Sequence, residues 1–97
     1  MKRIFKTIAF ASLLFLASCG NNPEKSRNFY DKGMDYLYCS QFEEAIENFD
    51  KAIKYNDQNH EAYFYRGCAK YNILQKEAAL EDYNKTLELN PNYLQAY

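Results

Sequence analysis

The side chains able to do covalent or metal chemistry are few: three cysteines and one histidine in 97 residues. Cys39 and Cys68 either pair as a disulfide in an oxidising compartment or pack as small apolar residues. His60 has no second histidine at ligand spacing, whereas a zinc site needs several convergent ligands. The sequence has no Gly-rich phosphate loop, no G-x-S-x-G motif and no cysteine with a histidine partner. It therefore predicts no catalytic site, no metal and no cofactor, and hence no enzyme.

The charge pattern argues against a nucleic-acid partner. The formal net charge is −1, but Lys2, Arg3 and Lys6 lie within the first six residues. The rest of the chain carries nine bases against thirteen acids, a balance of −4. Nucleic-acid binding needs a basic surface, and no basic patch stands out in this part of the sequence. We interpret the many carboxylates as the solvated faces of helices.

An internal repeat organises the chain. Residues 26–59 match residues 60–93 when shifted by 34 positions without a gap. Phe29 then meets Tyr63, and apolar residues meet apolar residues at the other core-like positions. The seven identical positions are, in the first copy, Gly33, Gln41, Glu43, Ala45, Glu47, Lys51 and Asn56. A fixed period of this size predicts stacked repeats rather than one closed core.

Each copy has the pattern of two helices. Apolar residues at helical spacing predict a first helix of about a dozen residues. Ser40 followed three positions later by Glu43 is typical of a capping box, so a second helix is expected to begin there. In the second copy the expected helices cover roughly residues 60–73 and 76–89. Residues 92–97 have the pattern of a further helix that begins after Pro91.

Small residues recur where paired helices would have to approach closely. They are Gly33, Ala45 and Ala52 in the first copy and Gly67 and Ala79 in the second. A glycine in mid-helix costs about 1 kcal/mol relative to alanine. We expect close packing of the two helices of each pair to compensate for this cost. The sequence thus predicts an all-α fold of tandem antiparallel helix hairpins.

These residues resemble the tetratricopeptide repeat (TPR). The first copy carries the family's aromatic, glycine and alanine positions as Phe29, Gly33, Tyr36, Ala45, Phe49 and Ala52. The second carries Tyr63, Gly67, Ala79, Tyr83 and Pro91. The resemblance covers residues 26–97 and implies a TPR-type α-solenoid with two full repeats and the start of a third. Other helical-hairpin repeats, such as the Sel1-like type, have slightly different periods and remain an alternative.

The chain also departs from the family pattern. Lys70 replaces an aromatic residue and Thr86 replaces an alanine in the second copy. The first copy has Asp57 where the family usually has proline. Both copies have a base, Lys32 or Arg66, where the family usually has leucine. These departures place polar side chains at positions that are usually apolar, but they do not break the period.

The resemblance further implies a concave groove, lined by the first helix of each repeat, that binds a protein or peptide partner. The corresponding positions in the first copy are Arg27, Tyr30, Asp31, Met34, Leu37 and Tyr38. In the second copy they are Glu61, Phe64, Tyr65, Cys68, Tyr71 and Asn72. The alternative is that Tyr30, Phe64 and Tyr71 only pack against neighbouring helices. The family's carboxylate clamp uses Lys and Asn where this chain has Tyr30 and Met34, so recognition of chaperone C-termini is not implied.

The N-terminal residues have the order of a secretory signal peptide. Three bases precede an apolar run over residues 8–17, which is too short to span a membrane. The run leads to Leu16-Ala17-Ser18-Cys19, which resembles the bacterial lipobox. The resemblance implies cleavage before Cys19 and its modification by fatty acids such as palmitate. The alternatives are an ordinary signal peptide with a chance cysteine, or a buried N-terminal helix.

We therefore expect a signal peptide (1–18), a lipidated cysteine with a flexible tether (19–25), two repeats (26–59 and 60–93) and the start of a third (94–97). This organisation predicts a membrane-anchored lipoprotein that acts as a protein–protein interaction scaffold in the bacterial cell envelope. It would face the periplasm, and Gly20 after the cysteine favours the outer membrane. Because arrays usually cover their last apolar face with a capping helix, the last helix is expected to be half covered and available for a homodimer. The alternative is a self-associating spacer, or a fragment of a longer protein without a function of its own.

Overall fold

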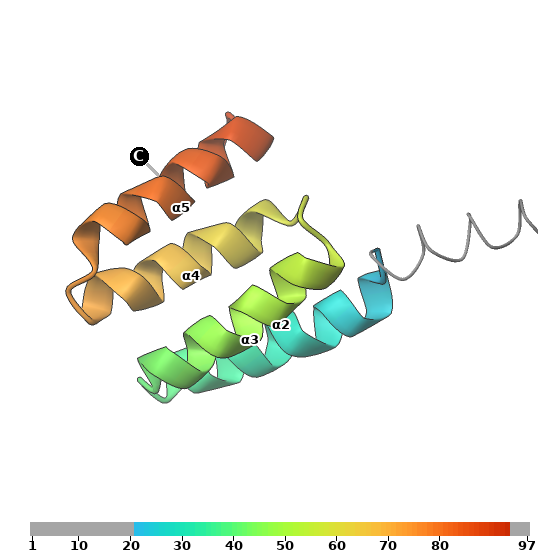
Figure 1. Ribbon diagram of the computed structural model, residues 1–97, viewed down its shortest axis with the longest axis horizontal. Coiled ribbons are helices and arrows are strands. Elements are labelled where there is room, and N and C mark those ends of the chain that lie inside the picture. Colours follow the sequence, from blue (N-terminus) through green and yellow to red (C-terminus); the bar gives the residue numbers. More distant parts are fainter. Residues whose placement is uncertain (1–20, 94–97) are drawn as a thin grey trace, which may run out of the picture.

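Two helix hairpins form the body of the protein. The computed structural model describes residues 21–93, which contain four α-helices and no strand. The helices are α2 (Pro23–Tyr38), α3 (Phe42–Tyr55), α4 (His60–Asn72) and α5 (Lys76–Leu89). Figure 1 shows them as two antiparallel hairpins, α2–α3 and α4–α5, that stack side by side. The all-α fold of tandem hairpins that the repeat predicted is confirmed.

Several predicted segments fall outside this description. The signal peptide at 1–18, Cys19 and the start of a third repeat at 94–97 all lie beyond residues 21–93. Among the helices of residues 21–93, none is both long enough and apolar enough to cross a membrane.

Each hairpin closes tightly around a glycine. A Cβ atom added to Gly33 would lie 2.6 Å from Cε1 of Phe49. One added to Gly67 would lie 2.9 Å from Cε1 of Tyr83. The alanines expected at these crossings are fully buried: Ala45, Ala52 and Ala79. The predicted close approach of the paired helices is confirmed.

The core lies where the first hairpin meets the second. Its centre is Ala45 and Phe49 of α3 with Ala69 of α4, all 0% exposed. Partly buried side chains surround this centre: Tyr30, Met34, Leu37, Phe42, Ile46 and Tyr65. Because the centre draws on both hairpins, burial of apolar surface holds the two repeats to each other.

The capping box predicted at Ser40 is wrong. Ser40 has a left-handed φ of 59°, and α3 begins at Phe42 with Gln41 as its N-cap and no side-chain capping bond. Leu74, at the equivalent position of the second repeat, has a φ of 68°. Both hairpins therefore turn through one left-handed residue, and this turn rather than a serine cap sets where the second helix begins.

Helix α2 begins earlier than expected. Asn22 is its N-cap, and the Asn22 side-chain oxygen accepts a hydrogen bond of 3.1 Å from the backbone N–H of Lys25. Pro23 follows in the first helical turn, where its fixed φ and missing N–H are tolerated. The flexible tether predicted for residues 19–25 is therefore wrong for residues 23–25, which are helical.

The base that replaces the usual leucine connects three helices. Arg66 of α4 donates two hydrogen bonds to Asp82 of α5, at 2.9 Å and 2.7 Å, and one of 2.8 Å to Asp50 of α3. Lys70 adds an ion pair of 3.1 Å to Asp82, which is only 4% exposed. Burial lowers the pKa of Arg66, but its bonds to the two carboxylates outweigh this effect and raise the pKa. Two departures from the family pattern, Arg66 and Lys70, thus share one buried carboxylate.

Thr86, another departure from the family pattern, has a buried hydroxyl with a counterpart in the first repeat. Its hydroxyl contacts the carbonyl oxygens of Asp82 at 2.8 Å and of His60 at 3.3 Å, and it is fully buried. One repeat earlier, the hydroxyl of Ser26 donates to the carbonyl of Ala52 at 2.7 Å. In both hairpins a buried hydroxyl therefore joins the start of the first helix to the end of the second.

The two ends of the stack differ in polarity. Ala62 and Ala69 lie on one stripe of α4 and are 0% exposed, and Ala69 packs in the core against α3. One repeat earlier the same stripe of α2 carries Asn28 and Asp35, both exposed. At the other end of the stack, Leu80 of α5 is 59% exposed. The half-covered α5 that the sequence predicted is confirmed at Leu80, whereas the outer stripe of α2 is polar.

Candidate functional site

Two of the predicted groove residues meet across the junction of the hairpins. The rings of Tyr30 on α2 and Tyr65 on α4 lie 6.4 Å apart, centroid to centroid, in an edge-on arrangement at 61°. Tyr30 also packs at 5.8 Å against the ring of Phe49, which is fully buried. Because Tyr30 packs on the core through Phe49, its position is fixed. We call the Tyr30–Tyr65 pair, which lies between α2 and α4, the aromatic floor.

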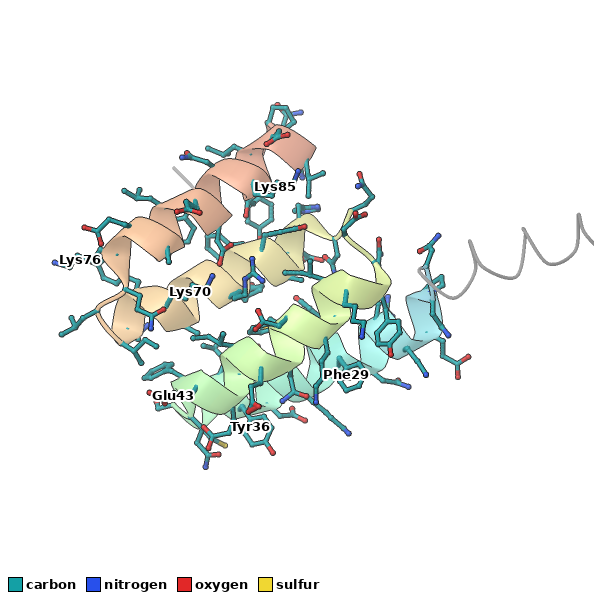
Figure 2. The ribbon with its side chains drawn as sticks, viewed as in Figure 1. Phe29, Tyr36, Glu43, Lys70, Lys76 and Lys85 are labelled. Carbon is teal, nitrogen blue, oxygen red and sulfur yellow. The ribbon has the colours of Figure 1, made fainter. Side chains whose placement is uncertain are left out.

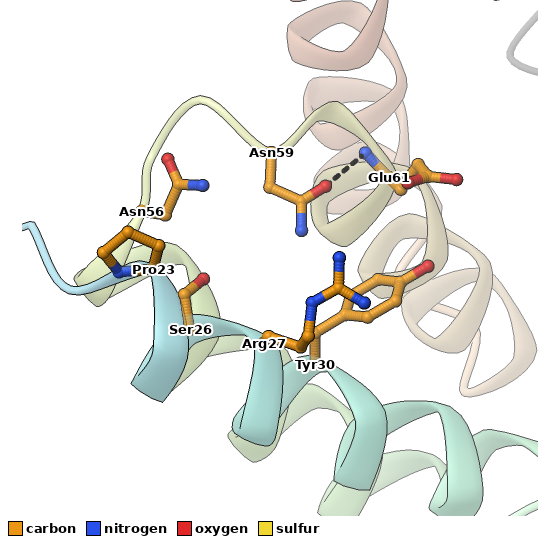
Figure 3. A pocket seen from close by; sticks show the side chains of 7 residues that line it. All are labelled: Pro23, Ser26, Arg27, Tyr30, Asn56, Asn59 and Glu61. Atoms are coloured by element: carbon orange, nitrogen blue, oxygen red, sulfur yellow. Dashed lines mark hydrogen bonds between the residues drawn. The ribbon is translucent and has the colours of Figure 1, made fainter.

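A cavity of about 220 Å³ lies beside this floor. It is lined by Pro23, Ser26, Arg27, Tyr30, Asn56, Asn59 and Glu61. Figure 3 shows that α2 supplies one wall, while the α3–α4 loop and the start of α4 supply the other. The structure therefore brings Arg27, Tyr30 and Glu61 of the predicted groove into one pocket.

The loop side of the pocket presents amide donors. The side-chain oxygen of Asn59 caps α4 by accepting from the backbone N–H groups of Glu61 at 3.1 Å and Ala62 at 3.3 Å. The side-chain oxygen of Asn56 accepts from the backbone N–H of Gln58 at 3.1 Å. Both oxygens are thus engaged within the loop, and Figure 3 shows the Asn59 nitrogen turned toward Arg27. Among residues 21–93 no hydrogen bond engages the two amide nitrogens, so they can donate to a ligand in the pocket.

The pocket is polar at its rim and neutral on its floor. Arg27 and Glu61 are both exposed, and Arg27 forms no ion pair within residues 21–93. Burial, followed by the Glu61 carboxylate, raises the pKa of Tyr30 above its ordinary value. The phenol is therefore uncharged at neutral pH. The pocket offers one cation, one anion and several neutral hydrogen-bonding groups around an aromatic surface.

Two further predicted groove residues lie against α5 instead. The Phe64 ring packs 5.6 Å from Tyr83, and Cys68 is a neighbour of the same tyrosine. Burial raises the pKa of Cys68, so its thiol is a poor nucleophile. Both Cys68 and Cys39 are free thiols, and Cys39 is exposed. The packing interpretation is therefore wrong for Cys39, and the two cysteines form no disulfide in this structure.

The remaining predicted groove residues are divided between the core and solvent. Met34 and Leu37 pack on the core, and the Asn72 side chain donates back to the Cys68 carbonyl at 2.8 Å. Three others are exposed, namely Asp31, Tyr38 at 78% and Tyr71 at 54%. Tyr30 and Phe64 contact neighbouring helices, as the packing alternative expected. The Tyr71 ring is half exposed and has the ammonium group of Lys76 on α5 6.0 Å from its centroid.

Some contributors could not be found from helix positions. Asn56 and Asn59 belong to the connecting loop, and Pro23 and Ser26 precede the first expected groove position. Tyr93 packs 5.2 Å from Phe64 and 4.9 Å from His60, which extends the aromatic surface toward the end of α5. Tyr93 occupies the repeat position of Asn59. The aromatic residue at the position where the first repeat has an asparagine was the feature of the sequence that could have indicated this contribution.

His60 has structural neighbours. Its Nε2 atom lies 3.3 Å from the side-chain nitrogen of Asn90, and its ring meets Tyr93 edge-on. Within residues 21–93, no three His, Cys, Asp or Glu side chains are grouped closely enough to hold a metal ion.

Comparison with known proteins identifies the repeat. A family model described as TPR repeat matches residues 33–73, and one described as tetratricopeptide repeat matches residues 60–93. The chain is 33% identical over 76 residues to the protein STIP1 homolog of Dictyostelium discoideum. That match covers 78% of this chain and 14% of the relative.

Solved structures share the arrangement of helices. The first TPR of Spaghetti (RPAP3), bound to the HSP90 peptide SRMEEVD, has a TM-score of 0.75 at 26% identity, over 80% of this chain and 62% of that one. The TPR2AB domain of yeast Sti1, in complex with pHSP90, has a TM-score of 0.79 at 26% identity. That match covers 99% of this chain and 36% of that one. The chain thus spans less than two thirds of each of these proteins.

Proposed function

Because residues 33–93 of this chain belong to the tetratricopeptide repeat family, whose domains act in protein–protein interaction, we propose that the concave face of α2 and α4 binds an extended peptide segment of a protein partner. The single observation that carries this proposal is the pocket between the two hairpins, which Tyr30 lines and beside which Tyr65 packs on the Tyr30 ring. Tyrosine pairs favour binding because they offer a large contact area and lose little rotamer entropy.

The pocket favours a peptide backbone with an apolar or aromatic side chain. The amide nitrogens of Asn56 and Asn59 can donate to peptide carbonyl oxygens. The ring of Tyr30 in the pocket lining, with Tyr65 packed beside it, provides an apolar surface for the side chain. A charged residue of the peptide can pair with either Arg27 or Glu61. The solved relatives include one complex with an HSP90 peptide and one with pHSP90, and the first supports a peptide as the class of ligand.

The sequence motif of the peptide is proposed to differ from that of the HSP90 complexes. The clamp positions of the first repeat are Tyr30 and Met34, and those of the second are Phe64 and Cys68. None of these side chains carries a positive charge at neutral pH. A carboxylate placed at Met34, Phe64 or Cys68 would have to give up its hydration without gaining an ion pair from these side chains, which is unfavourable.

A peptide library displayed on phage tests this proposal. The protein should enrich a family of related peptides, and a synthetic member should bind in calorimetry. Exchanging Arg27 and Glu61 together for alanine should weaken that binding at least tenfold, a loss of about 1.4 kcal/mol. The matched control replaces Lys76 and Glu81, one base and one acid on α5. No enrichment, or equal effects of the two double variants, would contradict the groove.

We extend the proposal to the membrane. The lipobox-like segment before Cys19 supports a lipoprotein that is anchored by acylation in the bacterial cell envelope, faces the periplasm and favours the outer membrane. Two or more acyl chains hold a protein stably at a bilayer, whereas one holds it only marginally. In this proposal the anchored protein is a scaffold that presents its groove to a partner. In bacteria grown with labelled palmitate, the wild-type chain should carry the label and the Cys19→Ser variant should not. An unlabelled wild-type chain would contradict the proposed lipid anchor.

A second candidate function is self-association, and the exposed Leu80 is the observation that favours it. Head-to-tail stacking would place Leu80 of one copy against the polar outer stripe of α2, which is unfavourable. A symmetric contact between two α5 helices avoids this cost. Sedimentation should then show a dimer for the wild type and a monomer for Leu80→Glu; a monomeric wild type at all concentrations would reject the candidate.

A further inference from the structure

Four lysines gather around one pair of aromatic rings at the outer side of the first hairpin. The rings of Phe29 on α2 and Tyr55 on α3 are stacked, with centroids 5.9 Å apart and planes within 6°. The ammonium groups of Lys32 and Lys51 lie 5.9 Å and 5.4 Å from the Phe29 centroid. Those of Lys25 and Lys54 lie 5.2 Å and 5.8 Å from the Tyr55 centroid. We call Lys25, Phe29, Lys32, Lys51, Lys54 and Tyr55 the lysine–aromatic face.

The lysines of this face form no ion pair within the part of the chain that the structure describes. Within residues 21–93 the basic residues in ion pairs are Arg66, Lys70 and Lys85, and none of them belongs to the face. Cation–π contacts hold an ammonium group over a ring by about 0.5–1 kcal/mol at exposed sites, but they leave its charge in place. Four like charges side by side repel one another. An anionic surface laid on the face would remove this repulsion.

A hollow of about 330 Å³ adjoins the rings. Its lining residues include Lys32, Lys51, Tyr36 and Asn48. The side-chain nitrogen of Asn48 donates one hydrogen bond to the carbonyl oxygen of Glu44 at 2.9 Å and keeps a second N–H. Asp35 is the one acid in the lining. The hollow therefore has the size and the donors to receive an oxyanion group, with Phe29 providing an apolar wall.

The start of α2 places this face next to the proposed lipid anchor. The backbone N–H of Asn22 donates to the carbonyl oxygen of Tyr55 at 2.8 Å, which fixes the chain beside the aromatic pair. Cys19 precedes Asn22 by three residues. Three residues extend over at most about 11 Å. An acyl chain on Cys19 would therefore bring the bilayer surface to the edge of the lysine–aromatic face.

We propose that the lysine–aromatic face binds the anionic headgroups of phospholipids and orients the protein on the membrane. The orientation part rests on the proposed acylation of Cys19, whereas headgroup binding rests on the lysines and rings themselves. Each lysine near an anionic bilayer contributes about 1 kcal/mol. The face lies on α2 and α3, so the α5 end of the stack would point away from the bilayer (Figure 2).

Vesicle binding tests the proposal independently of acylation. The full chain carrying Cys19→Ser is mixed with phosphatidylcholine vesicles that contain or lack phosphatidylglycerol. We expect binding to rise with phosphatidylglycerol and to fall at high salt. Adding Lys32→Gln and Lys51→Gln should lower the partition coefficient on anionic vesicles about 30-fold, the equivalent of two lysines at about 1 kcal/mol each.

The matched control carries Lys76→Gln and Lys85→Gln, which remove the same charge from α5 at the far end of the stack (Figure 2). It should bind anionic vesicles like the parent chain, and circular dichroism should show equal helix content in all forms. Equal losses for the two double variants, or no dependence on phosphatidylglycerol, would overturn the proposal. So would binding to polyglutamate without binding to vesicles, since it would identify an acidic protein as the occupant. Palmitate labelling of the wild type reports separately on the anchor.

Discussion

Removing the guanidinium of Arg66 should destabilise the whole stack. Arg66→Ala deletes two hydrogen bonds to Asp82, which is 4% exposed, and one to Asp50, whose side chain is 54% exposed. Breaking a buried ion pair by removing one partner costs about 3–5 kcal/mol. Lys70 remains 3.1 Å from Asp82 and keeps part of the compensation. We therefore expect a loss near the lower limit, about 3 kcal/mol.

Urea unfolding followed by far-UV circular dichroism measures this loss. For a domain of this size each kcal/mol corresponds to roughly 4–8 °C, so the midpoint of thermal unfolding should fall by about 12 °C or more. Asp50→Asn is the control, because an exposed ion pair contributes about 1 kcal/mol at most. Replacing Arg66 and Asp82 together by leucine should recover part of this loss, since the buried carboxylate is removed together with its main partner. The recovery is incomplete because Lys70, whose side chain is 18% exposed, then loses its ion pair with Asp82.

The reasoning is refuted if Arg66→Ala costs no more than Asp50→Asn. That result would mean that water replaces the guanidinium at Asp82, so that the carboxylate is effectively solvated in spite of its low exposure. A double leucine variant that is less stable than Arg66→Ala would likewise show that the charges themselves hold the hairpins together.

Three further predictions concern the backbone and the aromatic surface. Gly33→Ala should destabilise by about 1–2 kcal/mol in urea unfolding despite its better helix propensity, because its Cβ would overlap the buried ring of Phe49; an unchanged midpoint would contradict the close approach. Leu74→Gly should stabilise by up to about 1 kcal/mol, since Leu74 is 79% exposed and has a left-handed φ, and a loss of stability would count against this. Burial raises the pKa of Tyr93 from 10.0 to about 12. The neutral phenol therefore contributes its full stabilisation below pH 10, and this stabilisation disappears as the pH rises toward 12. Denaturant titrations at fixed pH should show that Tyr93→Phe loses less stability between pH 10 and 12 than the wild type does; equal losses for the two proteins would refute the assignment.

The sequence located the hairpins because its signals are local and repeated. The shift of 34 residues aligned Gly33 with Gly67, and both mark close helix crossings in the structure. It failed at Ser40, because a serine and a glutamate at capping-box spacing do not report the left-handed φ that the turn imposes. Helix starts depend on such backbone details, which side-chain patterns describe poorly.

The candidate site was predictable only in part, since it combines residues of α2 and α4 with residues of the loop between α3 and α4. Arg27, Tyr30 and Glu61 followed from the resemblance to a known repeat. Asn56 and Asn59 did not, because the direction of their amides depends on how the loop is capped. The hydrogen bonds of Arg66 to two different helices could not be predicted from the sequence either, since Asp50 and Asp82 each lie 16 positions away from Arg66 along the chain.

The polar outer stripe of α2 gives the array a direction of growth. A hairpin fused ahead of α2 would have to bury Asn28 and Asp35 without partners, whereas one fused behind α5 would cover Leu80. Asn84 occupies the repeat position of Asp50, so Asn84→Asp would offer a carboxylate to an arginine in the added hairpin. An engineered version with a longer concave surface should therefore be extended at its α5 end, with the Arg66 linkage copied once for each hairpin.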